Sequence, residues 1–467
     1  MTPGVSARTL CESLEGRWHA PLPGEGPSWI NAGTDSRKIT PGQVFVALKG
    51  ARSDGHDHLP EAVRRGAILA VVERAVEGAA CPQLIVEDTL VALRQMGRLA
   101  LEAHRKAGHR LIALTGSVGK TTTRELIRAG LPPGESHGSA GNENNEIGVP
   151  LTLLSWPEAA RWCVLEVGIR NFGDMDILAP LLESETGIVT AIAPVHLETL
   201  GTLKGVWKEK SKLLRAVVAG GCRIFPEEVR RNESKDPLFA DGSRRLRSVA
   251  LDDDLNASVS GRFLIEEGQM VLAVRNPPVR LPLPWPSRAL GWCSLMALAA
   301  LIDEEVNLEE AAARISNYRG FSGRMERRHH SSGLLLLLDH YNANPASMGG
   351  ALEWLEREKL LRPGARGYAV LGDMLELGED SAAFHREIGE RAAATGLEAI
   401  WYRGEQKASF TAGFLKGGGR ESQIHEAGSF ERDLKEGRGP RPEDVLLVKG
   451  SRGMKLEDVV ATLLEGA

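Results

Sequence analysis

The sequence predicts an α/β protein of three domains with mostly parallel sheets. Its 467 residues suit about three domains of ordinary size. An apolar strand, a glycine loop and a helix follow one another at residues 110–128, the order found at the ligand edge of a parallel sheet. Strand and helix patterns alternate again from about residue 323 onward. We therefore expect domains at 1–107, 108–322 and 323–467.

Composition and charge narrow the class of protein. Hydrophobic residues make up 42% and charged residues 25%, as in a soluble globular protein, and the formal net charge of −5 argues against a general nucleic-acid-binding protein. The five cysteines are scattered without a C-x-x-C pair, which favours free thiols in a reducing cytoplasm. The sequence shows no apolar export signal and no apolar run near 18 residues, so we expect no membrane span.

The first domain carries a polar loop beside a predicted strand at 44–48. Asp35, Ser36 and Arg37 precede this strand, and a hydroxyl beside a fork-shaped cation suits a phosphate or a uracil group. A capped turn explains the same residues equally well. Residues 87–107 have a helical pattern that leads into the central domain.

The central domain opens on a glycine loop that predicts a phosphate site. Backbone N–H groups would face an anion, Lys120 adds a positive charge, and Thr121 offers a hydroxyl to Mg²⁺. The full Walker spacing would require glycine at Leu114, so this loop is a shortened variant. A surface glycine–lysine turn is the alternative interpretation. The candidate phosphate-binding residues are Thr115, Gly116, Ser117, Val118, Gly119, Lys120, Thr121 and Thr122.

A carboxylate and an amide-rich segment follow the glycine loop. Glu166 lies in the apolar strand pattern of 162–168, and a carboxylate at the end of a parallel strand is a candidate Mg²⁺ ligand. Residues 141–151 are rich in amides and glycines, so Asn144 and Asn145 could bond a sugar, an amide or a phosphate. A plain loop is the other interpretation of this segment.

His196 and a lysine-rich helix are weak signals on their own. His196 follows a predicted strand at 186–192, where packing is a commoner role than ligation. A helix with several lysines usually presents a solvated face. That helix carries Lys204, Lys208, Lys210 and Lys212.

The last domain places polar loops after its strands, where α/β sheets bind ligands. It has no glycine phosphate loop of its own, but Asp339 and Asn342 follow its first predicted strand. The glycine-rich segment 319–324, which ends in Arg324, predicts a hinge before it. Its strands are predicted at 334–338, 368–371 and 445–448.

Several of these segments together resemble the Mur ligases, ATP-dependent enzymes that form amide bonds in peptidoglycan synthesis. The shared features are the shortened glycine loop, Glu166, His196 with Lys210 fourteen residues later, and Gly323-Arg324 at the hinge. Three further segments are similar to those of the branch of the family that adds D-alanyl-D-alanine. They are 141–150, 341–345 and 372–378, and the first-domain motifs at 35–37 and 54–56 fit the same pattern.

The resemblance implies a reaction and a set of catalytic residues. ATP would phosphorylate the terminal carboxylate of a UDP-N-acetylmuramoyl-tripeptide, and the amine of D-Ala-D-Ala would attack the acyl phosphate. The implied catalytic residues are Lys120, Glu166, His196 and a carbamylated Lys210, with one or two Mg²⁺ ions on Thr121, Glu166, His196 and Lys210. A carbamate forms on the neutral amine, so we expect burial or nearby positive charge to lower the pKa of Lys210.

The resemblance also distributes the binding residues over three domains. These would be an N-terminal α/β UDP-binding domain, a central P-loop-type ATPase domain and a C-terminal Rossmann-like domain, in a cytoplasmic monomer. Arg324 would reach the phosphates of ATP and Asp339 its ribose when the third domain closes. The implied substrate contacts are Asp35, Ser36 and Arg37 for the uridine diphosphate, with Asn144, Asn145 and Asn342 elsewhere.

One departure from the family pattern concerns the nucleotide base. Members of the family usually carry a Gly-x-His-Asn-x-x-Asn type stretch on the apolar helix at 288–302, and its asparagine contacts adenine. Trp292, Cys293 and Met296 occupy those positions here, and none offers the paired donor and acceptor of an amide. We therefore expect a working ligase with relaxed base preference.

Three alternatives stay open at the level of sequence. A related Mur-type or polyglutamate-type ligase would keep the chemistry and change the acceptor or the amine. A P-loop regulatory switch would bind nucleotide without this chemistry, although the Asn-Lys pair of a GTPase base-reading motif does not occur in the chain. A non-catalytic relative would explain the altered helix, and the intact Lys120, Glu166, His196 and Lys210 argue against it.

Overall fold

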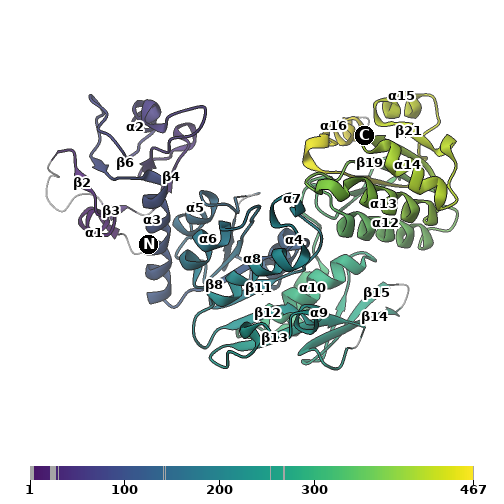
Figure 1. The fold of residues 1–467 in the computed structure, drawn as a ribbon, viewed down its shortest axis with the longest axis horizontal. Coiled ribbons are helices and arrows are strands. Elements are labelled where there is room, and N and C mark those ends of the chain that lie inside the picture. The colour runs from purple at the N-terminus through teal and green to yellow at the C-terminus, as the bar shows by residue number, and fades with distance from the viewer. Residues whose placement is uncertain are drawn as a thin grey trace.

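The computed structural model describes residues 5–20, 28, 29, 31–139, 141, 143–252, 254–266 and 269–465. Within them the chain forms a three-domain α/β fold, and each domain has its own large sheet (Figure 1). The central domain lies between the other two. None of the helices in these ranges combines the length and the apolar character that a membrane crossing requires.

The sheet of the first domain has five strands and is parallel except at one edge. Its order is β2 (Arg17–Trp18), β7 (Gln83–Ile85), β6 (Leu69–Val72), β5 (Val44–Val46) and β4 (Ala32–Gly33), with β2 antiparallel to β7. A separate pair joins β1 (Val5–Ser6) to β3 (Ser28–Trp29). The domain also contains α1 (Ala7–Ser13), α2 (Leu59–Arg64) and most of α3 (Thr89–Lys106).

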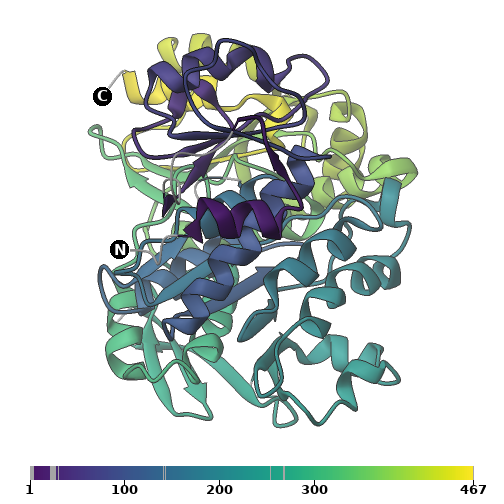
Figure 2. The same ribbon diagram turned by 90° about the vertical axis from the view of Figure 1, so that its left-hand side faces the viewer.

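Helix α3 joins the first domain to the central one because it belongs to two hydrophobic cores. Leu93 and Met96 pack into the core of the first domain, and Leu101 packs into a core of the central domain. A Cβ on Gly97 would lie 2.8 Å from Pro150, so glycine there allows α3 to approach α5 (Gly148–Leu154) closely. Figure 2 looks onto the first domain, with the blue and teal central domain below it.

The central sheet has nine strands, of which seven, including β8 (Arg110–Thr115), are parallel to one another. The order is β16 (Val279–Pro282), β15 (Gln269–Arg275), β14 (Val259–Glu266), β13 (Arg245–Leu251), β12 (Cys222–Pro226), β11 (Thr186–Val189), β8, β10 (Trp162–Glu166) and β9 (Ser136–Gly138). Strands β14, β15 and β16 pair antiparallel. The helices are α4 (Lys120–Gly130), α5, α6 (Asp174–Leu182), α7 (Leu197–Leu200), α8 (Leu203–Arg215), α9 (Glu227–Asn232), α10 (Arg288–Leu301) and α11 (Leu308–Ser316).

The register of the central strands brings the candidate site residues to one edge. Strand β8 lies between β10 and β11 and is parallel to both. Glu166 at the end of β10 pairs with Leu114, and Val189 at the end of β11 pairs with Thr115. The glycine loop, Glu166 and the segment after β11 therefore emerge at the same carboxyl edge of the sheet.

The third domain has a six-stranded sheet that is parallel apart from β17 (Glu326–His329). The remaining order is β18 (Leu335–Leu338), β22 (Val445–Lys449), β19 (Gly367–Gly372), β20 (Leu397–Arg403) and β21 (Ile424–Glu426). Its helices are α12 (Pro345–Leu360), α13 (Ser381–Ala394), α14 (Lys407–Lys416), α15 (Phe430–Lys435) and α16 (Glu457–Glu465). The polar segments after β18, β19 and β22 lie at one edge, because these strands are parallel.

Most predicted elements are confirmed, and all five cysteines are free thiols. The strands predicted at 110–115, 162–168 and 186–192 are present as β8, β10 and β11, although the last two end earlier. The loop interpretation of 141–151 is partly wrong, because the chain forms α5 from Gly148 onward. Asn142 of that segment lies outside the described residues. The domain boundaries at 107/108 and 322/323 stay predictions.

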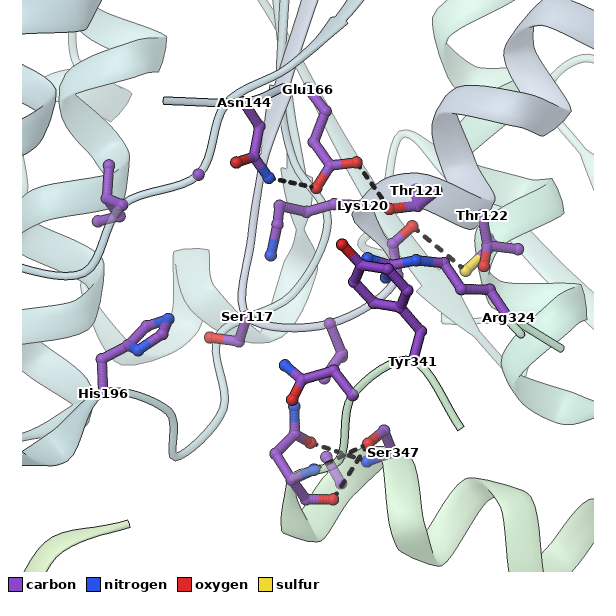
Figure 3. Close-up of a pocket in the computed structure, with 18 of the residues that line it drawn as sticks. Ser117, Lys120, Thr121, Thr122, Asn144, Glu166, His196, Arg324, Tyr341 and Ser347 are labelled. Carbon is purple, nitrogen blue, oxygen red and sulfur yellow. Dashed lines mark hydrogen bonds between the residues drawn. The ribbon is translucent and has the colours of Figure 1, made fainter. Parts of the chain in front are cut away.

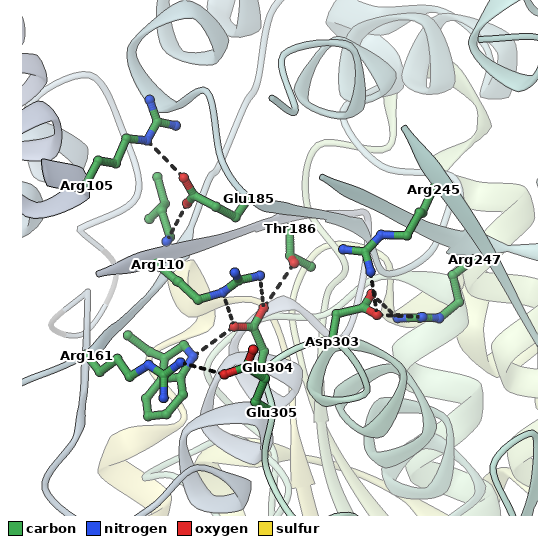
Figure 4. A network of polar contacts seen from close by, with 12 residues as sticks. Arg105, Arg110, Arg161, Glu185, Thr186, Arg245, Arg247, Asp303, Glu304 and Glu305 are labelled. Atoms are coloured by element: carbon green, nitrogen blue, oxygen red, sulfur yellow. Dashed lines mark hydrogen bonds and ion pairs between the residues drawn. The ribbon is translucent and has the colours of Figure 1, made fainter. Parts of the chain in front are cut away.

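A buried ion pair braces the central sheet at the edge opposite the glycine loop (Figure 4). The carboxylate of Glu304 is completely buried and accepts hydrogen bonds from Arg110 Nε at 2.6 Å and Trp162 Nε1 at 2.8 Å. Arg110 Nη2 donates a third at 3.4 Å, and Thr186 Oγ1 donates a fourth at 3.2 Å. Arg110, Trp162 and Thr186 begin β8, β10 and β11, so one carboxylate links the first residues of three adjacent strands.

We predict that Glu304→Ala lowers the free energy of unfolding by about 3 kcal/mol, because it leaves a partly buried guanidinium and an indole N–H without their acceptor. The neighbouring Glu305 is 81% exposed and pairs with Arg161, so Glu305→Ala should change stability by less than about 0.5 kcal/mol. Denaturant unfolding followed by tryptophan fluorescence measures both variants. Equal destabilisation by the two substitutions would contradict this account.

Candidate active site

A cavity of about 570 Å³ lies between the central and third domains (Figure 3). The central domain contributes the glycine loop, Glu166, His196 and part of α10, and the third domain contributes Arg324, Asp339 and residues of α12. Ser117, Val118, Gly119, Lys120, Thr121 and Thr122 of the predicted phosphate loop line it. Thr115 and Gly116 lie at the end of β8, outside the lining.

The glycine loop is held in one conformation by the segment that follows β11. Gly116 has a φ of 154°, and a Cβ there would lie 2.0 Å from Thr190 Oγ1, so no larger residue fits. Thr190 Oγ1 donates to Val118 O at 2.6 Å, and Ser117 Oγ donates to Ala193 O at 3.0 Å. The N-cap of α4 is Gly119, which has no side chain to bond the N–H groups of the first turn, so these backbone donors are available to an anion.

Glu166 is buried, and two neutral donors orient its carboxylate. Thr121 Oγ1 donates to Oε2 at 2.7 Å, and Asn144 Nδ2 donates to Oε1 at 3.0 Å. Burial acts to raise the pKa of Glu166, but the charges of Lys120, Arg324 and Arg124 outweigh it, and the pKa is lowered. The site therefore holds an ionised carboxylate next to the hydroxyl of Thr121.

Two lysines interact electrostatically with this carboxylate, the half-buried Lys120 and the fully buried Lys210. Lys120 Nζ donates to Gly116 O at 2.8 Å, and burial lowers its pKa although Glu166 acts in the opposite direction. Lys210 is 1% exposed, and burial together with the charge of Lys120 lowers its pKa well below the usual value. The lowering that the sequence predicted for Lys210 is confirmed in direction and cause.

The solvated-face interpretation of α8 is wrong for Lys210. Lys204 and Lys208 are exposed, and the half-buried Lys212 pairs with the exposed Asp176 and the buried Glu209. Lys210 is instead 1% exposed and belongs to the buried face of the helix.

His196 meets the third domain directly. It has a left-handed backbone conformation with a φ of 51°, lines the cavity, and places Nδ1 2.7 Å from Oε2 of Glu376. Burial lowers the pKa of His196, whereas Glu376 acts to raise it. In Figure 3 its ring faces the side of the cavity where Ser117 and Lys120 lie.

The third domain contributes a cation and an ion pair to the cavity. Arg324 follows Gly323, which has a φ of 69°, and its guanidinium stacks over the ring of Tyr341 at 3.9 Å. Asp339 Oδ2 accepts from Lys449 Nζ at 2.5 Å, and its Oδ1 accepts from a backbone N–H at 3.0 Å. Lys449 also donates to the carbonyl of Asn342 at 3.1 Å.

Lys449 is a site residue that sequence reasoning missed. It is 1% exposed, lines the cavity and ends β22. The signal was present as a polar segment after a predicted strand, but nothing in the sequence paired that segment with Asp339.

Helices α10 and α12 form the remaining wall. Trp292 and Cys293 line the cavity, whereas Met296 is fully buried in the core and does not reach it. The indole N–H of Trp292 donates to Thr190 O at 2.9 Å, so it is not available to a ligand. Opposite them, α12 contributes Ala351 and Trp354.

The amide-rich segment contributes two residues to the cavity. Asn144 lines it and bonds Glu166, as described above. Asn145 also lines it, but its Oδ1 accepts the N–H groups of Ile147 and Gly148 at 3.2 and 2.9 Å at the start of α5. Asn342 is in the lining as well.

The first-domain candidates lie apart from this cavity. Asp35 accepts both Nε and Nη2 of Arg37, at 2.8 and 2.9 Å, and its carboxylate caps a single 3-10 turn. Ser36 is buried, and its hydroxyl donates to Glu61 at 2.9 Å. None of the three lines the cavity, and the structure does not bring them together with the glycine loop.

The donor set fits a magnesium ion that is bound together with phosphate. Glu166 and Thr121 offer a carboxylate and a hydroxyl that already touch, and Mg²⁺ usually takes one or two carboxylates plus substrate phosphates. Among the described residues, no three His, Cys, Asp or Glu side chains form a ready metal site. The arrangement therefore suits a metal that arrives with a nucleotide.

Comparison with known proteins finds matches to models of one protein family in all three domains. Residues 31–104 match the model of the Mur ligase family, catalytic domain, residues 114–255 match the Mur ligase middle domain, and residues 323–452 match the Mur ligase, glutamate ligase domain. The UDP-N-acetylmuramoyl-tripeptide–D-alanyl-D-alanine ligase of Bacillus subtilis is 31% identical over 441 residues, 92% of each chain. The protein of the same name from Escherichia coli is 33% identical and covers 92% of this chain and 93% of its own.

Solved structures agree with these relatives. A crystal structure of MurF from Acinetobacter baumannii superposes with a TM-score of 0.83, 27% identity and coverage of 99% and 100% of the two chains. MurF of Thermotoga maritima in complex with ADP superposes with a TM-score of 0.78 at 23% identity, covering 93% and 97%, and supports the fold. With matching models in all three domains and relatives above 30% identity along its length, this chain belongs to the Mur ligase family.

Proposed function

We propose that this chain is a UDP-N-acetylmuramoyl-tripeptide–D-alanyl-D-alanine ligase, which uses ATP to form an amide bond in the synthesis of peptidoglycan precursors. The relatives at 31–33% identity over nearly the full length carry this name. The observation that carries the proposal furthest is a single cavity that collects the glycine loop, Glu166, His196 and Arg324 from two domains. A ligase of this kind must bring a nucleotide triphosphate and a carboxylate together there.

The reaction has two steps. The terminal carboxylate of the tripeptide attacks the γ-phosphorus of ATP, which gives an acyl phosphate and ADP. The free amine of D-Ala-D-Ala then attacks the acyl carbon, loses a proton, and expels inorganic phosphate through a tetrahedral intermediate. The acyl phosphate must be protected from water, and a site between two domains can exclude water when they close.

Residues of the central and third domains are assigned roles in this reaction. Lys120 and the backbone donors at the start of α4 hold the β- and γ-phosphates, and Arg324 adds a second cation from the third domain. Glu166, Thr121 and His196 would hold Mg²⁺, which would neutralise charge on the phosphates. Asp339 accepts a ribose hydroxyl, and Lys449 keeps its carboxylate in place.

Lys210 acts as a carbamate in this proposal. Its amine is buried and its pKa is well below the usual value, so the neutral form that attacks CO₂ is available. The attack forms an N–C bond and releases a proton, and the product is an anionic oxygen ligand next to Glu166. The carbamate would complete the oxygen ligands for one or two Mg²⁺ ions.

In this proposal the long acceptor substrate extends from the first domain to the cavity between the central and third domains. Arg37 is 76% exposed and is the best placed of the first-domain candidates to meet the uridine diphosphate, while Asp35 aligns it and Ser36 supports the turn. Asn144, Asn145 and Asn342 line the cavity, where the peptide end must arrive. We also propose that the protein is a monomer and that it works in the cytoplasm, where ATP and nucleotide-linked precursors are found.

We predict that phosphate release requires both UDP-N-acetylmuramoyl-tripeptide and an amine, and that D-Ala-D-Ala is preferred over single amino acids by about 100-fold in kcat/KM. A coupled phosphate assay with a panel of amino acids and dipeptides measures this. A preference for glutamate or another amine would indicate a different ligase of the family. Phosphate release that ignores both acceptor and amine would indicate a nucleotide switch.

We predict that Lys210→Ala lowers kcat by about 100-fold or more, because it removes an anionic ligand from the phosphate site. Lys208→Ala, on the same helix but exposed, is the control and should keep full activity. Incubation with ¹³C-bicarbonate should give a carbamate carbon resonance in the parent and in the control, and none in Lys210→Ala. A Lys210→Ala variant as active as the parent would exclude the carbamate role.

We predict a low ratio of ATP to GTP in kcat/KM, because neither Trp292 nor Cys293 can read a base edge as an asparagine does. Steady-state assays with both nucleotides, beside a relative that carries the asparagine, measure the ratio. A ratio as large as that of the relative would show that another residue reads adenine.

A further inference from the structure

Glu376 crosses from the third domain to a candidate catalytic residue of the central domain. Its Oε2 lies 2.7 Å from Nδ1 of His196, and it makes no second ion pair among the described residues. Nothing in the sequence singled out this contact, because 180 residues separate the two side chains. An acceptor at Nδ1 fixes which ring nitrogen of a neutral histidine carries the proton.

The loop that presents Glu376 is rigid at its base. Asp373 accepts from Tyr402 Oη at 3.0 Å and from the backbone N–H of Glu405 at 2.8 Å. The next two N–H groups are also bonded, Met374 to Nε2 of His385 at 2.9 Å and Leu375 to Oγ of Ser451 at 3.0 Å.

Glu376 follows this base in a left-handed conformation, with a φ of 62°. Its position is therefore set by the third domain, and its carboxylate reaches His196 only while that domain stays against α7.

A second contact from the same loop provides an internal comparison. The N–H of Gly378 donates to Oε1 of Glu198 at 3.2 Å, and Glu198 lies two residues after His196 on α7. Both contacts join the same two domains, but only the one from Glu376 touches the imidazole. If these contacts only held the two domains together, loss of either one should have the same effect on activity.

We propose that Glu376 is a positioning residue for the ligase reaction: it accepts the Nδ1 proton of His196 and leaves the Nε2 lone pair free for the phosphate site. This inference rests on the proposed function, in which His196 contributes to holding the metal. Histidine ligands commonly donate their other ring N–H to a carboxylate, which fixes the ring and its tautomer. Here that carboxylate comes from another domain, so the ligand is ordered only when the third domain is seated.

The test uses the full chain and a readout that does not depend on turnover. In ¹⁵N-histidine spectra at a pH where the imidazole is neutral, His196 is assigned by its loss in His196→Ala. We expect the Nδ1–H tautomer in the parent, in Glu376→Gln, which keeps an acceptor, and in the matched control Glu198→Ala. We expect Glu376→Ala to lose that tautomer preference.

Steady-state activity measurements provide a second test. Glu376→Ala should lower kcat by about 10- to 100-fold with KM for D-Ala-D-Ala nearly unchanged, and Glu376→Gln should restore part of the loss. Combining it with His196→Ala should give no further loss, because both changes remove one function. Glu198→Ala should retain kcat.

Three outcomes would overturn the inference: an unchanged His196 tautomer in Glu376→Ala, additive losses in the double variant, or equal effects of Glu198→Ala and Glu376→Ala. A parent protein that releases no phosphate with the proposed substrates would instead refute the proposed function, and the spectra would still decide the role of Glu376.

Discussion

The site depends on one constraint, which is that two amines and a carboxylate lie together at the carboxyl edge of the central sheet. Lys210 and Glu166 are buried there, Lys120 is half-buried, and Arg324 adds a further positive charge from the third domain. One carboxylate does not balance these cations, so the cavity favours a polyanion such as a triphosphate. Burial lowers the pKa of Lys210, and the positive charge of Lys120 lowers it further, so the amine is easy to deprotonate.

The backbone around this edge serves to keep those charges in place. The parallel register of β8, β10 and β11 sets Glu166 beside the glycine loop, and the buried Glu304 ties the same three strands together at their other ends. A shift of one strand by a residue would point Glu166 to the other face of the sheet. The position of Glu166 beside the glycine loop therefore depends in part on the Arg110–Glu304 ion pair at the opposite edge of the sheet.

Features that depend on local pattern could be predicted from the sequence. The apolar run of β8 and the glycines after it define the phosphate loop within a dozen residues, and the apolar strand that ends at Glu166 is visible in the same way. Recognition of the family added His196 and Lys210, whose own patterns favoured packing and solvent exposure.

Features that depend on packing between distant segments could not be predicted. Lys208 and Lys210 differ in burial only because α8 packs on the sheet with one face, and charge patterning along the helix does not reveal which face that is. The pairing of Asp339 with Lys449 joins two strands 110 residues apart. For Met296 the sequence prediction was wrong in the opposite direction. Its alignment with a base-contacting position placed it at the site, but the side chain is buried in the core.

Helix α3 has a consequence for which molecules can be substrates. Its 18 residues span about 27 Å, and it is packed into the cores of both domains, so it sets a fixed distance between them. An acceptor that is anchored at the first domain and reacts in the cavity must be long enough to cover that distance. Binding of one end then raises the effective concentration of the other end, and a free peptide without its nucleotide would lose that advantage. In the proposed function, the length of this helix would therefore favour acceptors of a particular length, whatever side chains bind their ends.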